Sequence, residues 1–142
     1  MHRLKVLFLC TGNSCRSQMA EGWARQLKAD CIEAYSAGVV QHGMNERAVR
    51  VMAEAGVDIS GQRSKTVDKL PVQEFDWIIT LCGHANEHCP LFPGTAKYIH
   101  HGFDDPPQLA ATAASEEEAL THYRRVRDEI KAFIADMPEN LG

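Results

Sequence analysis

The sequence predicts an α/β fold, a single three-layer domain in which helices flank a four-stranded parallel sheet. Two short runs, at residues 3–9 and 75–81, are apolar on both faces, as buried strands of parallel sheets are. Segments with helical spacing alternate with these and two further strands, and such alternation favours a parallel sheet. The 142 residues suit one domain over residues 1–142, because domains usually span roughly 100–200 residues.

Four strands are expected, and they cover residues 3–9, 32–36, 75–81 and 97–100. A helix over 17–29 follows from one apolar stripe at helical spacing, formed by Met19, Ala20, Trp23, Ala24 and Leu27. On another face of this helix Glu21 and Arg25 pair at i,i+4. Because catalytic groups in such sheets gather beyond the carboxyl ends of the strands, Cys10 and Cys82 are expected to face one crevice.

A second helix, over 46–55, is expected to start at an Asn45 cap and to end at Gly56. Its inward residues are expected to be Ala48, Val49, Met52 and Ala55. The last helix starts at a capping box formed by Ser115 and Glu118. Its apolar residues recur at helical spacing, at Leu120, Tyr123, Val126, Ile130, Phe133, Ile134 and Met137.

The composition excludes several classes of protein. Hydrophobic residues are 44% and charged residues 24%, which is ordinary for a globular protein and argues against disorder. No apolar run approaches the roughly 18 residues of a membrane span, and the run at residues 6–9 is too short for a signal-peptide core. A net charge of −4 argues against nucleic-acid binding. We therefore expect a cytoplasmic protein with no membrane and no nucleic-acid partner.

Five cysteines are the unusual count, at Cys10, Cys15, Cys31, Cys82 and Cys89. An odd number without a signal peptide argues against a structural disulfide framework. In a reducing compartment such thiols are buried, catalytic, redox-active or metal ligands. Cys15 is interpreted as packing or a weak donor, and Cys31 as an inert thiol.

The segment 10–17 joins a buried strand to a helix and has the composition of an oxyanion site. Small residues and Gly12 let successive N–H groups point inward at the start of a helix, where a tetrahedral anion binds. Arg16 adds a planar fork that matches two oxygens. Cys10 lies in the same positive field, which predicts a lowered pKa and a nucleophilic thiolate, with Ser17 as a donor to it. Substrate binding is thus assigned to Thr11, Gly12, Asn13, Ser14, Cys15, Arg16 and Ser17.

Asn13 tolerates a positive φ and can fix this loop through its amide. The alternative for the whole segment is an ordinary strand-to-helix turn with a buried cysteine. The order of cysteine, five residues, arginine and serine favours the oxyanion site. It is not a Walker A loop, because it lacks the Gly-Lys-Ser/Thr ending.

A second cluster spans residues 80–90 and contains Cys82 and Cys89, seven positions apart, with His84 and His88 between them. Three interpretations stay open. A zinc site is disfavoured because zinc ligands usually come in close pairs. Buried structural cysteines are the second interpretation. The third is redox chemistry, in which two cysteines near a third thiolate pass on a disulfide by thiol exchange.

The segment 10–17 resembles the phosphate loop of low-molecular-weight protein tyrosine phosphatases. Those enzymes also use an acid from an Asp-Pro motif late in the chain, and Asp105 before Pro106 matches it. Such an acid protonates a leaving oxygen while the thiolate attacks. On its own, the Asp105-Pro106 pair favours a surface turn.

With its second cysteine cluster, nearly the whole chain resembles the thioredoxin-coupled arsenate reductases, a branch of the same fold. The matching stretches are Cys-Thr-Gly-Asn-Ser-Cys-Arg-Ser-Gln-Met-Ala-Glu-Gly at 10–22, Tyr-Ser-Ala-Gly at 35–38, Asp-Ile-Ser at 58–60, Thr-Leu-Cys-Gly at 80–83, Cys-Pro at 89–90, Gly-Phe-Asp-Asp-Pro at 102–106 and Arg-Val-Arg-Asp-Glu-Ile at 125–130. Gln18 replaces a proline typical of the phosphatases, and Pro107 replaces a common tyrosine. Both departures point away from a tyrosine phosphatase.

The resemblance implies a reaction that detoxifies arsenate. Cys10 attacks the arsenic while Arg16 and the loop amides hold the oxygens and Asp105 protonates the departing oxygen. Cys82 then attacks the Cys10 sulfur and arsenite leaves. Cys89 next forms a disulfide with Cys82, which thioredoxin reduces. This implies a monomer with no bound cofactor and thioredoxin as external reductant, although glutaredoxin or mycothiol stay open as reductants.

Some members of that family bind potassium through residues matching Asn13, Glu21 and Ser36, together with an acid after Ser64. Here that last position is Lys65, whose ammonium would repel a cation and pair with Glu21. We therefore expect no metal site, or else a Lys65 that is simply solvated. Two other functions remain open: hydrolysis of phosphotyrosine or small phosphoesters, and a non-enzymatic module that senses oxyanions or metals.

Overall fold

A four-stranded parallel sheet forms the centre of the computed structural model, which describes residues 3–90 and 92–141. Its strands are β1 (Leu4–Cys10), β2 (Ile32–Gly38), β3 (Trp77–Thr80) and β4 (Lys97–His100). They lie in the order β2-β1-β3-β4, and each neighbouring pair is parallel. The predicted fold class is confirmed. The order also brings the carboxyl ends of β1 and β3 side by side.

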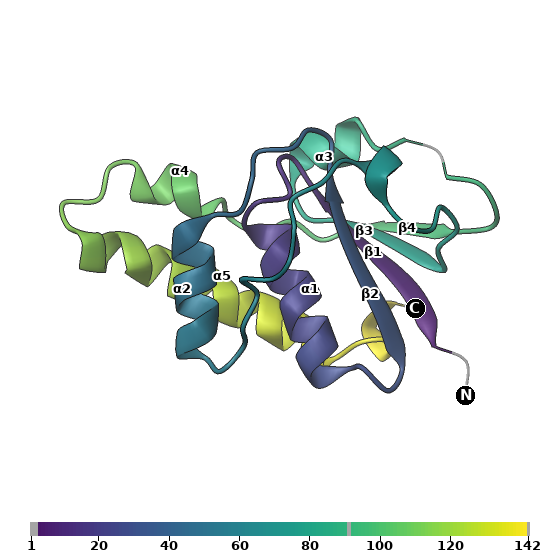
Figure 1. Cartoon of the computed structure of the whole chain (residues 1–142), viewed down its shortest axis with the longest axis horizontal. Helices are drawn as coiled ribbons and strands as arrows, with labels where there is room; N and C mark the ends of the chain where they lie inside the picture. Colours follow the sequence, from purple (N-terminus) through teal and green to yellow (C-terminus); the bar gives the residue numbers. More distant parts are fainter. Residues whose placement is uncertain (1–2, 91, 142) are drawn as a thin grey trace.

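Five α-helices surround the sheet in the described part of the chain: α1 (Arg16–Leu27), α2 (Glu46–Glu54), α3 (Gly83–Glu87), α4 (Pro106–Ala110) and α5 (Glu116–Ala135). Short 3-10 helices cover Val67–Lys69 and Glu139–Leu141. α1 packs on β2, β1 and α5, whereas α2 and α4 pack against α5. Figure 1 shows α3 at the carboxyl end of the sheet, near the loop that follows β1. The short helices α3 and α4 were not predicted.

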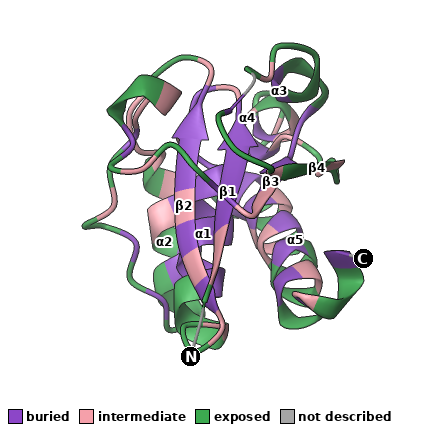
Figure 2. Ribbon diagram, turned by 90° about the vertical axis from the view of Figure 1, so that its right-hand side faces the viewer, coloured by how far each residue is buried: buried purple, intermediate pink, exposed green. Residues whose placement is uncertain are grey.

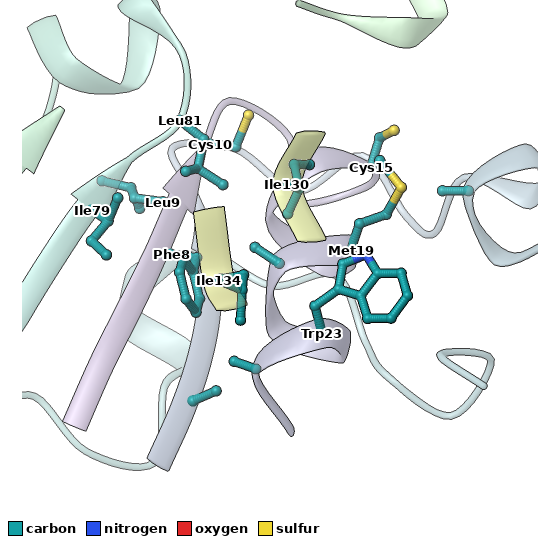
Figure 3. Close-up of a cluster of buried hydrophobic side chains, with 14 of the residues drawn as sticks. Phe8, Leu9, Cys10, Cys15, Met19, Trp23, Ile79, Leu81, Ile130 and Ile134 are labelled. Carbon is teal, nitrogen blue, oxygen red and sulfur yellow. The ribbon is translucent and has the colours of Figure 1, made fainter. Parts of the chain in front are cut away.

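The main core lies between the sheet and the pair α1 and α5. Phe8 of β1, Met19 and Trp23 of α1, and Ile130 and Ile134 of α5 belong to one cluster of buried side chains, and all five are at most 2% exposed (Figure 3). The Trp23 indole N–H donates to the Arg127 carbonyl at 3.2 Å, so its one polar atom is satisfied. Burial is concentrated in β1, β2 and β3, while β4 at the edge is largely exposed (Figure 2).

Aromatic residues cover part of the opposite face. The Tyr35 ring of β2 meets Phe75 edge-on with ring centroids 5.6 Å apart, and Phe75 meets Phe92 in the same way at 5.6 Å. Phe92 lies just beyond the second cysteine cluster, and its N–H donates to the Tyr98 hydroxyl at 3.0 Å. The carboxyl-terminal end of that cluster is therefore attached to the sheet.

The predicted helix caps are present, with one change. The Asn45 side chain accepts from the Ala48 N–H at 3.1 Å, and Ser115 accepts from the Glu118 N–H at 3.1 Å. The Glu118 carboxylate, however, accepts from the N–H of Ala114 at 2.7 Å. In a regular capping box Glu118 would accept from the N–H of Ser115, so this second hydrogen bond is shifted by one residue.

Two inward assignments were wrong, those of Leu27 and Ala55. Leu27 is 37% exposed because it is the last residue of α1. In α2 the buried residues are Ala48, Val51 and Met52, and Val49 is partly buried against the same core. Ala55 is exposed, because α2 ends at Glu54.

The turn after α2 requires a left-handed residue. Gly56 supplies it with φ +85°, as predicted from its position after the apolar stripe. Met137 is buried as expected, although it lies beyond the end of α5. Within residues 3–90 and 92–141, no helix combines the length and the apolar character needed to cross a membrane.

Candidate active site

Cys10 and Cys82 meet at the carboxyl end of the sheet. Cys10 is the last residue of β1, and the Leu81 N–H donates to the Leu9 carbonyl at 2.9 Å, which aligns the end of β3 beside it. Figure 3 shows Cys10 at the tip of β1 next to Leu81. The Thr11 hydroxyl, one residue after Cys10, lies 3.1 Å from the Cys82 sulfur, and each of the two thiols shifts the pKa of the other. The two cysteines therefore lie close together at one edge of the sheet.

The loop after Cys10 exposes a row of backbone donors. In the described residues, the N–H groups of Gly12, Asn13, Ser14 and Cys15 have no protein acceptor. Asn13 has φ 50°, which makes it the only non-glycine residue with positive φ in the described part of the chain. Successive N–H groups around such a residue form a concave anion site. The expectation for Asn13 is therefore confirmed.

Side chains fix the shape of this loop from the side of α1. The Asn13 amide donates to the Ser17 hydroxyl at 2.8 Å, and Gln18 donates to the Asn13 carbonyl at 3.0 Å. Both Asn13 and Gln18 are fully buried. The expected donation from Ser17 to Cys10 is not among the hydrogen bonds of the described residues, where Ser17 accepts from Asn13.

The segment at residues 62–65 holds the loop from the other side. Ser64 donates to the Gly12 carbonyl at 3.0 Å, and the Lys65 N–H donates to the Asn13 side chain at 2.9 Å. Gly38, at the end of β2, allows the close approach: a Cβ there would lie 2.8 Å from the Asn13 nitrogen and 2.8 Å from the Thr11 carbonyl. Gly38 and Ser64 were not among the predicted site residues. A glycine directly after a strand was the available signal.

Arg16 points its guanidinium toward the Asp-Pro segment. Its Nη1 donates to the Phe103 carbonyl at 2.9 Å, and its Nη2 lies 3.5 Å from the Asp105 carboxylate. Asp105 precedes α4, and Pro106 occupies the first position of that helix. The predicted acid, Asp105, therefore lies beside the guanidinium of Arg16, which is predicted to bind the oxyanion. The Phe103 carbonyl could not be anticipated, because any residue type supplies one.

The two central thiols have opposite proton affinities. The contact with Cys82 and burial raise the pKa of the Cys10 thiol, although the Arg16 charge opposes both. Donation from Cys10 lowers the pKa of Cys82 to about 4 against the effect of burial, with help from the Thr11 hydroxyl and the Ala85 N–H. The expected low pKa of Cys10 is therefore wrong. The difference arises because the donors around the pair are directed at the Cys82 sulfur.

Cys82 also caps a helix. Its sulfur accepts from the Thr11 hydroxyl, or donates to it, at 3.1 Å and accepts from the Ala85 N–H at 3.4 Å, so it is the N-cap of α3. Cys89 lies one residue beyond the C-cap of α3. A helical rise of about 1.5 Å per residue separates their Cα atoms by roughly 10 Å, outside disulfide range. All five cysteines are free thiols.

The remaining thiols lie apart from this arrangement. Burial raises the pKa of Cys89, which is partly exposed, and its sulfur faces the Pro90 carbonyl at 3.5 Å. Cys15 is 5% exposed and belongs to the main core, where burial raises its pKa. Cys31 is partly exposed at the start of β2. These positions agree with packing for Cys15 and a surface thiol for Cys31.

A charged cavity of about 460 Å³ lies behind the loop, lined in part by Glu21, Ser36 and Lys65. Glu21 is 4% exposed and accepts from the Ser36 hydroxyl and from Arg25, as predicted for Arg25. The Lys65 ammonium donates to the Ser36 carbonyl at 3.1 Å, and burial lowers its pKa. Glu21 attracts Lys65 without a close ion pair among the described residues. That part of the chain also holds no group of three His, Cys, Asp or Glu side chains suited to a metal.

Comparisons with known proteins agree with this geometry. Residues 5–141 match the family model of the low molecular weight phosphotyrosine protein phosphatases. The chain is 49% identical to an arsenate reductase of Halalkalibacterium halodurans over 98% of both chains. It is 50% identical to an arsenate reductase of Bacillus subtilis over 94% of both.

Solved structures give the same result. An arsenate reductase in its oxidised state has a TM-score of 0.76 at 31% identity, covering 97% of this chain and 98% of that one. A low molecular weight tyrosine phosphatase from T. tengcongensis has a TM-score of 0.73 at 27% identity, covering 96% and 99%. With a thiol at the end of β1, an anion loop and a facing Asp-Pro acid, the chain belongs to the low molecular weight phosphotyrosine protein phosphatase family.

Proposed function

We propose that this chain reduces arsenate to arsenite through Cys10, Cys82 and Cys89. The observation that carries the proposal is the juxtaposition of Cys10 and Cys82 at the base of the anion loop, where the hydroxyl of Thr11, the residue after Cys10, lies 3.1 Å from the Cys82 sulfur. Hydrolysis of a phosphoester needs one thiol, whereas reduction of an oxyanion needs two that can form a disulfide. The two relatives named as arsenate reductases support the same choice.

In the first step Cys10 becomes bonded to arsenic. Its proton passes to Cys82, and the resulting thiolate lies in the field of Arg16, which favours the charged form. Loop N–H groups and Arg16 hold the arsenate oxygens. As sulfur attacks arsenic(V), Asp105 donates its proton to a departing hydroxyl, which leaves as water.

In the second step arsenic is reduced. Cys82 loses its proton to water, and the thiolate is stabilised by the Thr11 hydroxyl and the Ala85 N–H. It attacks the Cys10 sulfur, so the electron pair of the sulfur–arsenic bond stays on arsenic. Arsenic(V) becomes arsenic(III) and leaves as arsenite. The two sulfurs lose the two electrons that arsenic gains, and they form the Cys10–Cys82 disulfide.

In the third step the disulfide moves outward. Cys89 attacks the Cys82 sulfur and releases Cys10 as a thiolate, which leaves a Cys82–Cys89 disulfide. Because α3 holds these residues roughly 10 Å apart, the helix must unwind for the bond to form. Loss of the Cys82 thiolate as N-cap removes one contact that stabilises α3. Thioredoxin, the proposed partner, then supplies two electrons and restores both thiols.

The proposed enzyme binds no cofactor and works as a monomer in the cytoplasm, where free thiols persist. Hydrolysis of phosphotyrosine or small phosphoesters is the second candidate function. Cys10, Arg16 and Asp105 are sufficient for it, and the T. tengcongensis tyrosine phosphatase shares the fold at 27% identity. Such a hydrolase would require neither Cys82 nor Cys89.

A coupled assay separates the two functions. Arsenate with thioredoxin, thioredoxin reductase and NADPH should consume NADPH with the wild-type chain. Cys82→Ser should reduce that rate by at least about a thousandfold while it retains slow hydrolysis of p-nitrophenyl phosphate. Absence of NADPH consumption, or equal loss of both activities in Cys82→Ser, would overturn the proposal.

A further inference from the structure

The segment at residues 101–105, here called the acid loop, is held along the end of β3 by its backbone. The His101 N–H donates to the Thr80 carbonyl at 2.9 Å, and the Phe103 N–H donates to the Leu81 carbonyl at 3.0 Å. These bonds continue the parallel pairing of β4 with β3 beyond the last ladder residue. They fix the position of the Phe103 backbone along the strand direction, next to the active site.

The Phe103 carbonyl contacts the Arg16 guanidinium directly. It accepts from the Arg16 Nη1 at 2.9 Å, while Asp105, two residues further along, lies 3.5 Å from Nη2. The Arg16 side chain is 10% exposed, so it has little freedom outside these contacts. The direction of the guanidinium therefore depends on where the acid loop places one carbonyl oxygen.

The Phe103 side chain, on the other side of the same residue, packs against α5. Its ring centroid lies 6.0 Å from that of Phe133 in an edge-on contact, and the His101 ring lies 4.8 Å from Phe103 and 4.3 Å from Phe133. Edge-on and tilted aromatic contacts of this kind have a preferred geometry, which restricts where the ring can sit. A second contact joins the acid loop to α5: the Arg125 guanidinium lies 2.9 Å from the carboxylate of Asp104, the residue after Phe103.

Arg125 and Phe133, the two residues of α5 that contact the acid loop through an ion pair and an aromatic contact, lie on one stripe with Glu129 between them. Arg125, Glu129 and Phe133 recur at i, i+4 and i+8, and the Arg125 guanidinium also pairs with Glu129 at 2.8 Å. A hollow of about 560 Å³ lies beside this stripe and is lined in part by Phe103 and Phe133. Phe133 contacts both the Phe103 ring and the His101 ring, and because it belongs to the 20-residue helix α5 it supports the pair from a rigid element.

We propose that Phe133 is a positioning residue for Arg16. It acts through the Phe103 ring and carbonyl, touches no substrate, and keeps the guanidinium directed at the oxyanion that the anion loop binds. The inference rests on the proposed function only for the identity of that oxyanion as arsenate. Small displacements of a binding group have large effects on a fixed anion, so loss of this support weakens oxyanion binding.

Inorganic phosphate is the probe, because its binding requires no arsenate chemistry and no reductant. The Kd for phosphate is measured by 31P NMR or calorimetry for the wild type, Phe133→Ala, Phe133→Leu and Ile134→Val. Phe133→Ala should raise the Kd about tenfold, and Phe133→Leu should restore it to within about twofold. Failure of the NADPH assay with intact phosphate binding would count against arsenate reduction alone.

Ile134→Val is the matched control, because Ile134 is the next residue on α5, is fully buried and faces the main core. It should lower the melting temperature while the Kd for phosphate stays unchanged. The proposal is overturned if Phe133→Ala binds phosphate as tightly as the wild type. It is equally overturned if Ile134→Val weakens binding as much as Phe133→Ala, since a general loss of stability would then explain both.

Discussion

The Thr11 hydroxyl lies 3.1 Å from the Cys82 sulfur, although α1, β2, α2, a 3-10 helix and β3 separate the two residues in the sequence. The strand order explains the contact, because β3 inserts beside β1 and ends at the same edge of the sheet. Cys10, the residue before Thr11, is thereby brought beside Cys82 at the base of the anion loop, and each thiol shifts the pKa of the other. This pairing is what distinguishes the site from that of a hydrolase with a single thiol.

The first prediction concerns the thiolate. Because the folded pKa of Cys82, about 4, lies below that of a free thiol, Cys82 should stay deprotonated as the pH falls from 9 toward 4. Thiolate absorbance at 240 nm should accordingly persist at pH 6 in the wild type and be lost in Cys82→Ser. In denaturant the same titration should move to roughly pH 8.5. A wild type without thiolate absorbance at pH 6 would contradict the pairing.

The second prediction removes one partner of that thiolate. Thr11→Ala deletes the hydroxyl that lies 3.1 Å from the Cys82 sulfur. A hydrogen bond to a charged group contributes about 1.5–3 kcal/mol, so the pKa of Cys82 should rise by about 1–2. Thr11→Ser, which keeps the hydroxyl, is the matched control and should titrate like the wild type. An unchanged titration in Thr11→Ala would show that the hydroxyl does not stabilise the thiolate.

The third prediction concerns the cavity that contains Lys65. The ammonium donates to the Ser36 carbonyl, so a second cation should find no site there. The melting temperature of the wild type should be equal in KCl and NaCl at the same ionic strength. Lys65→Asp supplies a carboxylate beside Glu21 and should bind potassium, with about 1.4 kcal/mol of stabilisation at a tenfold excess over Kd. A wild type stabilised by potassium over sodium would contradict this interpretation.

The fourth prediction tests the anchor of the second cysteine cluster. Phe92 is 8% exposed and packs edge-on against Phe75. Phe92→Ala should lower the free energy of unfolding by about 3 kcal/mol, measured by urea denaturation, because it leaves a cavity beside the sheet. Phe92→Leu keeps most of the volume and should cost less than about 1.5 kcal/mol. Equal midpoints for Phe92→Ala and the wild type would mean that this ring is not packed.

The sequence predicted the elements whose patterns are long and repetitive. The apolar run before Cys10 predicted β1, and the stripe around Met19 and Trp23 predicted α1, because burial on a sheet selects residues at regular spacing. The anion loop was also predictable, because its small residues and Arg16 are neighbours in the sequence and bind an anion through the local shape of one strand-to-helix turn. Element ends were less accurate: β3 is Trp77–Thr80, shorter than the apolar run at 75–81.

Features that depend on contacts between distant segments were not predictable. α3 is too short to show helical periodicity, and its N-cap is Cys82, which is not a common capping residue. α4 had a signal in Pro106 at its first position, which was interpreted only as part of the acid motif. The pKa of Cys10 was predicted in the wrong direction, because the sequence around it shows Arg16 but not the neighbouring thiol of Cys82.

The central claim is that Cys10 and Cys82 pass two electrons to arsenic and are left joined by a disulfide. Cys89→Ser removes the thiol that would resolve this bond and should trap it. The variant is reduced, freed of reductant, mixed with one equivalent of arsenate, quenched with acid and digested for mass spectrometry. The account predicts one equivalent of arsenite and a linked pair of peptides containing Cys10 and Cys82. Arsenite release without that linkage, or a linkage from Cys10 to Cys15 instead, would contradict it.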